Sequence, residues 1–281
     1  MTIDQLQRGR PQQIHTVRGG NGVRLHVREW GQPDGPAILL IHGWSHGLTC
    51  WRHQVEGELA AECRLVALDI RGHGMSERPR AEGAYQDAGV WAADIAAVIH
   101  QLNLHRPTLV GWSYGGFIIS DYLRAFGQDA IAAVNYVGAA VLLNKRFDHI
   151  GPGFLDNAAD ACAPDLTANI AAVRRLVRAY TVQPMNADDW DSALCANMVV
   201  PPEVRAALLA RQIDSNDVLA GLTVPVLVTH GTRDTVVLPS MAEHVLDVCP
   251  TAHASWYDAV GHLPFAEDPA RFDRELRELA T

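Results

Sequence analysis

The sequence of 281 residues contains neither a long hydrophobic run nor a paired cysteine motif. Its longest apolar stretch, residues 132–143, includes Asn135 and is too short to span a bilayer, and residues 1–13 show no apolar core of the kind a secretory signal needs. Five cysteines are widely spaced without a C-x-x-C pair, so neither a disulfide framework nor a cysteine-based zinc site is indicated. We therefore expect a cytoplasmic protein that is not embedded in a membrane.

Basic residues are also scarce relative to acidic ones. Lys and Arg total 23 against 32 Asp and Glu, which gives a formal net charge of −9. Nucleic-acid binding needs clustered Lys and Arg to contact phosphates, so this balance argues against a nucleic-acid partner and against a polyanionic substrate. We expect a small-molecule substrate. The sequence does not indicate an oligomeric state.

Short apolar runs alternate with helical patterns over most of the chain, which is typical of a mostly parallel α/β sheet. At this length and 48% hydrophobic content, one catalytic core with an insertion is the ordinary arrangement. We expect about eight strands with helices on both faces. The expected strands are residues 14–18 and 23–30, which form an opening hairpin, and then 37–41, 65–69, 108–110, 132–138, 225–229 and 253–257. The expected helices are 51–61, 86–102, 114–126 and 269–279.

This alternation is interrupted between residues 144 and 213. The segment reads as several short helices separated by glycine and proline breakers, and it contains no convincing strand. We interpret it as a helical cap inserted into an α/β core made of residues 1–143 and 214–281. The alternative is a packing appendage remote from any site.

A nucleophile elbow is indicated by the sequence Gly111-Trp112-Ser113-Tyr114-Gly115. The pattern G-x-S-x-G places a serine on a strained turn between a strand and a helix, where neighbouring backbone leaves little space for Cβ atoms. Here an apolar run precedes the pattern and a helical pattern follows it. We therefore predict that Ser113 is a catalytic nucleophile.

The same pattern occurs a second time, at Gly43-Trp44-Ser45-His46-Gly47. It also follows a strand, but helix-forming sequence resumes only near residue 51, and the segment comes too early in the strand order. We interpret it as a loop that helps to bind the oxyanion of acyl transfer, which needs two hydrogen-bond donors. The predicted donors are the backbone N–H groups of Trp44 and Tyr114.

A serine nucleophile also needs a general base and a carboxylate that orients this base, in the chain order Ser, acid, His. Asp234 follows the expected strand 225–229, and His262 lies in the loop after the strand 253–257. Both positions fall at the carboxyl ends of strands, where open α/β sheets form their sites. We predict a triad of Ser113, His262 and Asp234. Each residue alone could be an ordinary loop residue, but the order and context of all three favour catalysis.

The other motifs in the sequence give weaker indications of function. His42 and His46 are spaced H-x-x-x-H, but the intervening glycine and the loop context remove the helical face that a zinc motif needs, so no metal or cofactor is expected. Residues 69–76 read as a tight structural loop. Side chains that flank the motifs suggest an apolar substrate pocket, although they could equally face the core. The candidate substrate-binding residues are His46, Trp112, Phe117 and Leu263.

With these residues in hand, the chain resembles the α/β-hydrolase superfamily over nearly its whole length. The matching pieces are HGWSHG (42–47), DIRGHGMS (69–76), GWSYGG (111–116), GTRD (231–234) and GH (261–262). Within the superfamily it is similar to capped bacterial esterases, acyl-homoserine lactonases and haloperoxidase-like arylesterases. The resemblance implies hydrolysis of a carboxylic ester or lactone through an acyl-enzyme. A serine at the elbow departs from the haloalkane dehalogenases and epoxide hydrolases, whose nucleophile is aspartate.

Two alternatives stay open at this point. Cofactor-independent dioxygenases of heteroaromatic substrates look similar in the oxyanion loop, but they typically draw their acid from the end of the sixth strand, and residues 134–138 contain no carboxylate. Hydrolysis of an activated carbon–carbon bond would use the same triad. A binding protein on a decayed hydrolase scaffold would be expected to lack a triad residue, and none is missing.

Overall fold

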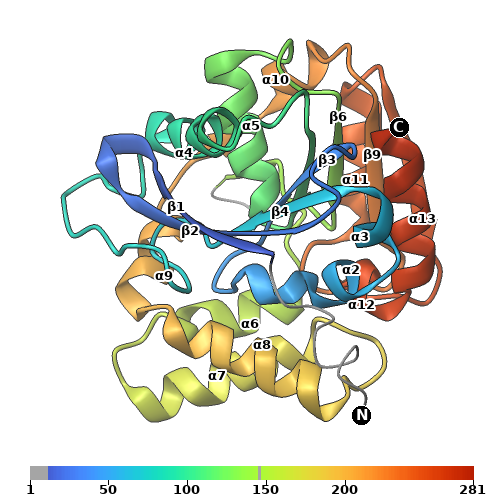
Figure 1. Ribbon diagram of the computed structural model, residues 1–281. Coiled ribbons are helices and arrows are strands. Elements are labelled where there is room, and N and C mark those ends of the chain that lie inside the picture. Colours follow the sequence, from blue (N-terminus) through green and yellow to red (C-terminus); the bar gives the residue numbers. More distant parts are fainter. Residues whose placement is uncertain (1–11, 145–146) are drawn as a thin grey trace, which may run out of the picture.

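Eight strands form one mixed, mostly parallel sheet at the centre of the molecule (Figure 1). The computed structural model describes residues 12–144 and 147–281, so residues 1–11 and residues 145–146 of the expected cap lie outside the described residues. The strand order is β1-β2-β4-β3-β5-β6-β9-β10, in which β1–β2 and β2–β4 are antiparallel and the other pairs are parallel. The expected sheet is confirmed. Its strands are β1 Gln13–Arg18, β2 Arg24–Gly31, β3 Ala37–Ile41, β4 Arg64–Leu68, β5 Thr108–Trp112, β6 Ala133–Val137, β9 Val226–Gly231 and β10 Ala252–Tyr257.

The inner strands are buried on both faces. All five residues of β3, of β5 and of β6 are buried, as parallel strands covered by helices require, whereas the edge strand β1 is largely exposed. Because β5, β9 and β10 run in the same direction, the loops that follow them meet at one edge of the sheet.

Helices cover both faces of this sheet. α4 (Ala88–Gln101) and α5 (Gly115–Phe126) pack together on one side, and α3 (Leu59–Glu62) and α13 (Pro269–Ala280) lie on the other (Figure 1). The remaining core helices are α10 Asn216–Ala220, α11 Pro239–Val248 and α12 Pro264–Glu267. Within residues 12–144 and 147–281, no helix is both long and apolar enough to cross a bilayer.

The single helix expected over residues 51–61 was wrong. The chain instead forms a 3-10 turn, η2 (Leu48–Trp51), followed by α2 (Arg52–Glu56) and α3. Gly57 ends α2 with an extended backbone, and a Cβ at this position would lie 2.7 Å from Oδ2 of Asp273 on α13. The glycine therefore allows the chain to turn where α13 packs closely against it.

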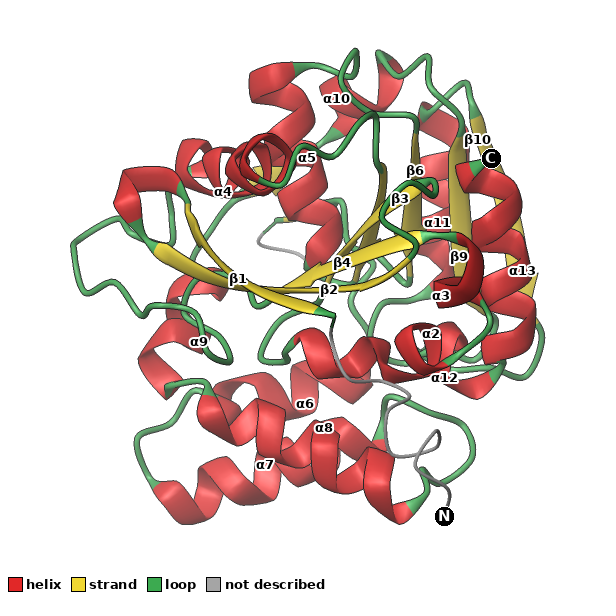
Figure 2. Ribbon diagram, in the orientation of Figure 1, coloured by secondary structure: helices red, strands yellow, loops and turns green. Residues whose placement is uncertain are grey.

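Four further helices lie together beyond the edge of the sheet at which these loops meet (Figure 2). They are α6 Pro152–Ala161, α7 Leu166–Arg178, α8 Ala187–Val199 and α9 Pro202–Leu209, and we call them, with their connections, the helical insert. A short antiparallel pair, β7 (Leu142–Leu143) and β8 (Ile213–Asp214), joins the chain where it enters the insert to the chain where it leaves. The sequence patterns did not indicate this pair.

Candidate active site

Ser113 lies on a sharp turn between β5 and α5. Its φ of +55° is in the left-handed region that a side chain rarely occupies, and its amide donates to the carbonyl oxygen of Val137 at 3.0 Å. The flanking glycines permit this turn. A Cβ on Gly115 would lie 2.6 Å from the carbonyl oxygen of Ile41, and one on Gly111 would lie 2.8 Å from the carbonyl carbon of Gly115. The half-buried Ser113 therefore occupies the strained strand-to-helix position that the sequence predicted.

Asp234 and His262, from the loops after β9 and β10, contact one another directly. Nδ1 of His262 lies 2.7 Å from Oδ2 of Asp234, and both side chains are at most 1% exposed. The other oxygen of Asp234, Oδ1, accepts from the amides of Val236 at 2.8 Å and Val237 at 3.0 Å. The carboxylate is thus fixed by its own loop. This arrangement holds His262 with the proton on Nδ1, so that Nε2 can act as a base.

The backbone of His262 is held by groups that the sequence did not reveal. Its amide donates to the carbonyl oxygen of Tyr180 in the helical insert at 2.7 Å, and its carbonyl oxygen accepts from Nε1 of Trp112 at 3.0 Å. The preceding amide, of Gly261, donates to the Glu267 carboxylate at 2.7 Å. The same carboxylate accepts from the amide of Val182 at 2.9 Å. Core and insert therefore position this loop together.

A second buried histidine, His230, also approaches Asp234. Its Nε2 lies 3.0 Å from the carbonyl oxygen of Val237 and 3.4 Å from Oδ2 of Asp234. A carbonyl oxygen can only accept, so Nε2 carries the proton. Burial lowers the pKa of His230, which keeps the ring neutral. The position of His230 at the end of β9 is the signal from which the sequence could have indicated this contact.

The loop containing Trp44 is held by two neutral histidines. Nε2 of His42 accepts from the amide of Ile70, and Nε2 of His73 accepts from the amide of Ser45, each at 3.1 Å. Burial lowers the pKa of both rings, which fits these accepting roles. Among the described residues, neither the amide of Trp44 nor that of Tyr114 is used in a hydrogen bond. Two donors are thus free beside Ser113.

The hydroxyl of Ser45, in the second G-x-S-x-G match, is fully buried and has no partner in the described part of the chain. Ser45 is therefore not placed to attack a substrate.

Ser113 lines a small apolar cavity of about 40 Å³ between the core and the insert. The other lining residues are Trp44, Tyr114, Phe117, Ala140, Leu143, Ile150, Phe154, Leu209, Val236 and Val237. A larger chamber of about 320 Å³ is lined by His46, two residues after Trp44, and not by Ser113.

The four candidate substrate-binding residues are divided between these spaces. Phe117 lines the cavity beside Ser113, whereas His46 and Leu263 line the larger chamber. Trp112 lines neither and packs between the His46 and His262 rings, with ring centroids 5.2 and 5.3 Å away. The sequence placed all four near the motifs but could not indicate which way each side chain points.

The loop over residues 69–76 forms structural contacts. The Asp69 carboxylate accepts from the amides of Leu48 and Met75, both at 2.9 Å. Arg71 forms a buried two-point ion pair with Asp94 at 2.7 Å. Within the described ranges, no group of three or more His, Cys, Asp or Glu side chains is placed to hold a metal ion.

The sheet, the elbow and the edge at which they meet define an α/β hydrolase fold. The chain belongs to the alpha/beta hydrolase family, whose model matches residues 38–275. An esterase from Rhodococcus sp. ECU1013 superposes with a TM-score of 0.90 at 35% identity, over 95% of this chain and 98% of that one. The resemblance seen in the sequence is confirmed.

Two curated bacterial relatives are similar over most of their length. The non-heme chloroperoxidase of Streptomyces lividans is 28% identical over 93% of this chain and 97% of that protein. The bifunctional esterase/perhydrolase of Acinetobacter calcoaceticus is 27% identical over 77% and 81% respectively. These similarities, with the Rhodococcus structure, identify an esterase-like hydrolase.

Proposed function

We propose that this protein hydrolyses a carboxylic ester or lactone through a triad of Ser113, His262 and Asp234. The observation that carries this proposal is the 2.7 Å contact between His262 and Asp234 at the sheet edge where Ser113 occupies its strained turn. The contact sets the tautomer a general base requires, and the turn presents the serine hydroxyl to the cavity.

In the first half of the reaction, Oγ of Ser113 attacks the carbonyl carbon while Nε2 of His262 takes the hydroxyl proton. The charge that develops on the carbonyl oxygen is bound by the amides of Trp44 and Tyr114, which are free to donate. Collapse of this intermediate breaks the bond to the leaving oxygen, which takes the proton from His262. The product is an acyl-enzyme and a free alcohol.

In the second half, His262 takes a proton from water, whose oxygen attacks the acyl carbon. The second intermediate expels Oγ of Ser113, which recovers its proton from His262 and leaves the carboxylic acid. Asp234 stabilises the imidazolium in both halves. These steps use only side chains and amides of this chain.

The cavity beside Ser113 points to a short, apolar acyl group. Its volume of about 40 Å³ exceeds the roughly 10–15 Å³ that one water molecule needs by a factor of only about three. Its side walls are apolar or aromatic, as in Phe117 and Phe154. We infer that only short acyl chains fit without displacing side chains.

We also propose that the helical insert acts as a cap, within the boundaries 144–213 that the sequence indicated. Ile150, Phe154 and Leu209 contribute part of the wall beside Ser113, and Nε1 of Trp44 donates to the carbonyl oxygen of Arg205 in α9 at 3.1 Å. These contacts favour a cap over a remote appendage.

Ester hydrolysis is favoured over the dioxygenase alternative by the position of the acid. Strand β6 (Ala133–Val137) and Gly138 after it contain no carboxylate, and the carboxylate that contacts His262 follows β9. Hydrolysis of a carbon–carbon bond would use the same groups, and a substrate panel separates it from ester hydrolysis.

The test compares two serines in matched contexts. Ser113→Ala should lose nearly all hydrolysis of ethyl butyrate while remaining folded, because acyl-enzyme formation needs that oxygen. Ser45→Ala is the matched control and should keep substantial activity, since its hydroxyl is buried and unpartnered among the described residues. A sulfonyl fluoride should label Ser113 stoichiometrically, as read by peptide mass spectrometry. An active Ser113→Ala enzyme would rule out the proposed nucleophile.

A further inference from the structure

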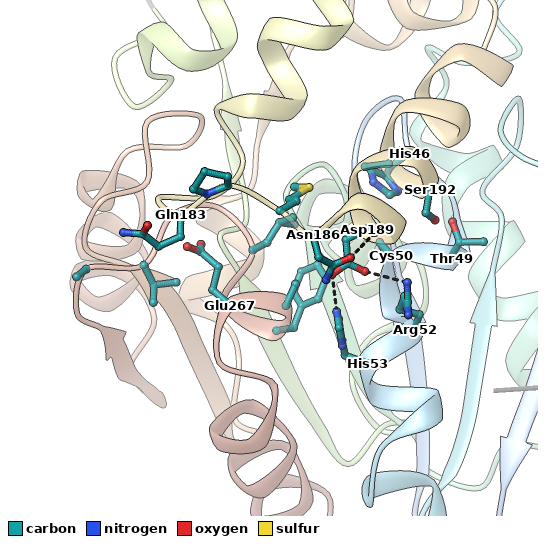
Figure 3. A pocket seen from close by; sticks show the side chains of 18 residues that line it. His46, Thr49, Cys50, Arg52, His53, Gln183, Asn186, Asp189, Ser192 and Glu267 are labelled. Carbon is teal, nitrogen blue, oxygen red and sulfur yellow. Dashed lines mark hydrogen bonds and ion pairs between the residues drawn. The ribbon is translucent and has the colours of Figure 1, made fainter. Parts of the chain in front are cut away.

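The larger chamber lies between the core, which contributes Arg52 and His53, and the insert, which contributes Asp189 (Figure 3). Its volume is about 320 Å³, some eight times that of the cavity beside Ser113 at about 40 Å³. Val260 and Leu263, which flank Gly261 and His262, form part of its wall. Ser192 and Ala193 of α8 contribute the insert side.

His46 provides this chamber with a buried hydrogen-bond donor. Its Nδ1 accepts from the Gly47 amide at 3.0 Å, which is the shorter of its two contacts with Gly47, the carbonyl oxygen being 3.3 Å away. We therefore assign the proton to Nε2, which has no partner among the described residues. The side chain is only 2% exposed, and burial lowers its pKa to about 3. His46 therefore presents a neutral N–H group near neutral pH.

The acidic groups of the chamber already have polar partners among the described residues. The Asp189 carboxylate contacts Nη1 of Arg52 and Nε2 of His53, each at 3.1 Å (Figure 3). The Glu267 carboxylate accepts from two backbone amides. Because Arg52 is already paired with Asp189, an anionic ligand finds no unpaired cation among these groups, so the chamber favours an uncharged ligand that carries hydroxyl groups over an anionic one.

The chamber and the small cavity are separated by the oxyanion loop. Trp44 lines the small cavity and His46 lines the chamber, two residues further along the same loop. An ester held at Ser113 with its acyl group in the small cavity directs its alcohol portion towards His262, which must protonate the leaving oxygen. Val260 and Leu263, which flank Gly261 and His262, bring the chamber wall to the loop that carries this base.

We propose that the chamber binds the alcohol portion of the substrate and selects an uncharged alcohol with several hydroxyl groups, with His46 as a donor to one of them. This inference rests on the proposed esterase function. The proposal also implies that the enzyme can transfer the acyl group to an alcohol. An alcohol bound in the chamber can attack the acyl-enzyme in place of water, giving its proton to His262 and forming a new ester as Oγ of Ser113 leaves and is reprotonated.

The experiment measures how the butyryl-enzyme, formed from methyl butyrate, divides between water, glycerol and propan-1-ol. Glycerol and propanol have the same number of carbons, and glycerol has two primary hydroxyls that can attack where propanol has one, so their ratio per primary hydroxyl reports the value of the additional hydroxyl groups. We expect transfer to glycerol to exceed transfer to propanol at equal concentration. Preferred transfer to propanol would overturn the inference and leave the esterase function intact. Absence of any hydrolysis in the native enzyme would overturn both.

Two variants test the location of the alcohol. Ser192→Trp fills the chamber from α8, and we expect it to lower glycerol transfer about tenfold or more relative to hydrolysis of methyl butyrate. Cys195→Trp, on an exposed position of the same helix outside the chamber, is the matched control and should leave the ratio unchanged.

His46→Leu removes the donor and should lower the glycerol-to-propanol ratio even if Ser192→Trp does not fold. If neither the Ser192 nor the His46 substitution changes the ratio in folded protein, the alcohol does not bind in this chamber.

Discussion

Replacing Asp234 with asparagine should disable the enzyme by giving His262 the wrong tautomer. Oδ1 of Asp234 accepts from two backbone amides, at 2.8 and 3.0 Å, so the asparagine oxygen is required at that position. Its NH2 group then occupies the position of Oδ2, 2.7 Å from Nδ1 of His262. A donor at this point forces Nδ1 to accept and places the imidazole proton on Nε2. His262 can then no longer take the proton of Ser113.

The size of the expected loss in activity follows from the energy of the reversed amide orientation, which would restore the correct tautomer of His262. Turning the amide round would leave two buried N–H groups facing NH2, and each unsatisfied group costs about 1–3 kcal/mol, or about 2–6 kcal/mol together. At about 1.4 kcal/mol for each factor of ten, the active orientation would be populated about 30-fold to 10⁴-fold less than in the native enzyme. The upper end equals the loss of about 10⁴ that a wrong tautomer causes in a serine triad.

The assay is the kcat for ethyl butyrate hydrolysis by the native protein and Asp234→Asn, with urea unfolding to confirm that the variant is folded. We expect kcat to fall by at least about 30-fold with little change in the unfolding midpoint. If a folded variant kept about a third or more of the native kcat, the tautomer of His262 would not depend on Asp234, and the proposed role of this carboxylate would be refuted.

Two further predictions concern His46 and Phe154. Burial lowers the pKa of His46 from 6.5 to about 3, so unfolding takes up a proton in that interval and the free energy of unfolding falls as the pH falls. His46→Gln should reduce the dependence of the free energy of unfolding on pH by up to about 1.4 kcal/mol per pH unit. Urea unfolding at pH 6 and pH 5 measures this dependence. An unchanged dependence would show that the His46 ring is not held neutral. Phe154 lines the cavity beside Ser113, and the centroid of its ring lies 5.1 Å from the centroid of the Trp44 ring. Phe154→Ala should raise the kcat/KM ratio of hexanoate to butyrate esters about tenfold, and an equal loss for both esters would contradict its place in the acyl pocket.

Elements with strong local patterns were predictable from the sequence. Strands β3, β5 and β9 are short apolar runs, and each leads directly into a motif. The elbow at Ser113 was recognisable because the G-x-S-x-G pattern is itself local and stands between an apolar run and a helical pattern. The prediction of one helix over 51–61 was wrong because the chain turns at Gly57, where Asp273 packs against it. Asp273 is far away in sequence, so no local pattern indicated this turn.

The supporting groups of the site could not be predicted. Tyr180 acts through a carbonyl oxygen, which every residue carries, so no side-chain pattern marks it. Glu267 reads as an ordinary acidic residue of a short helix. The division of His46 and Phe117 between two spaces depends on side-chain direction and on the insert packed above, neither of which local sequence determines.

The hydrogen bond from the His262 amide to Tyr180 limits how this enzyme can be rebuilt. A helical insert is an obvious part to exchange between relatives when a new specificity is wanted. Here the exchange would also remove the carbonyl oxygen that accepts from the amide of His262, the proposed general base, at 2.7 Å and the Val182 amide that donates to Glu267 at 2.9 Å. A chimaera would have to keep residues 180–182 from the original chain, or its turnover would fall for every substrate whatever the shape of the new pocket.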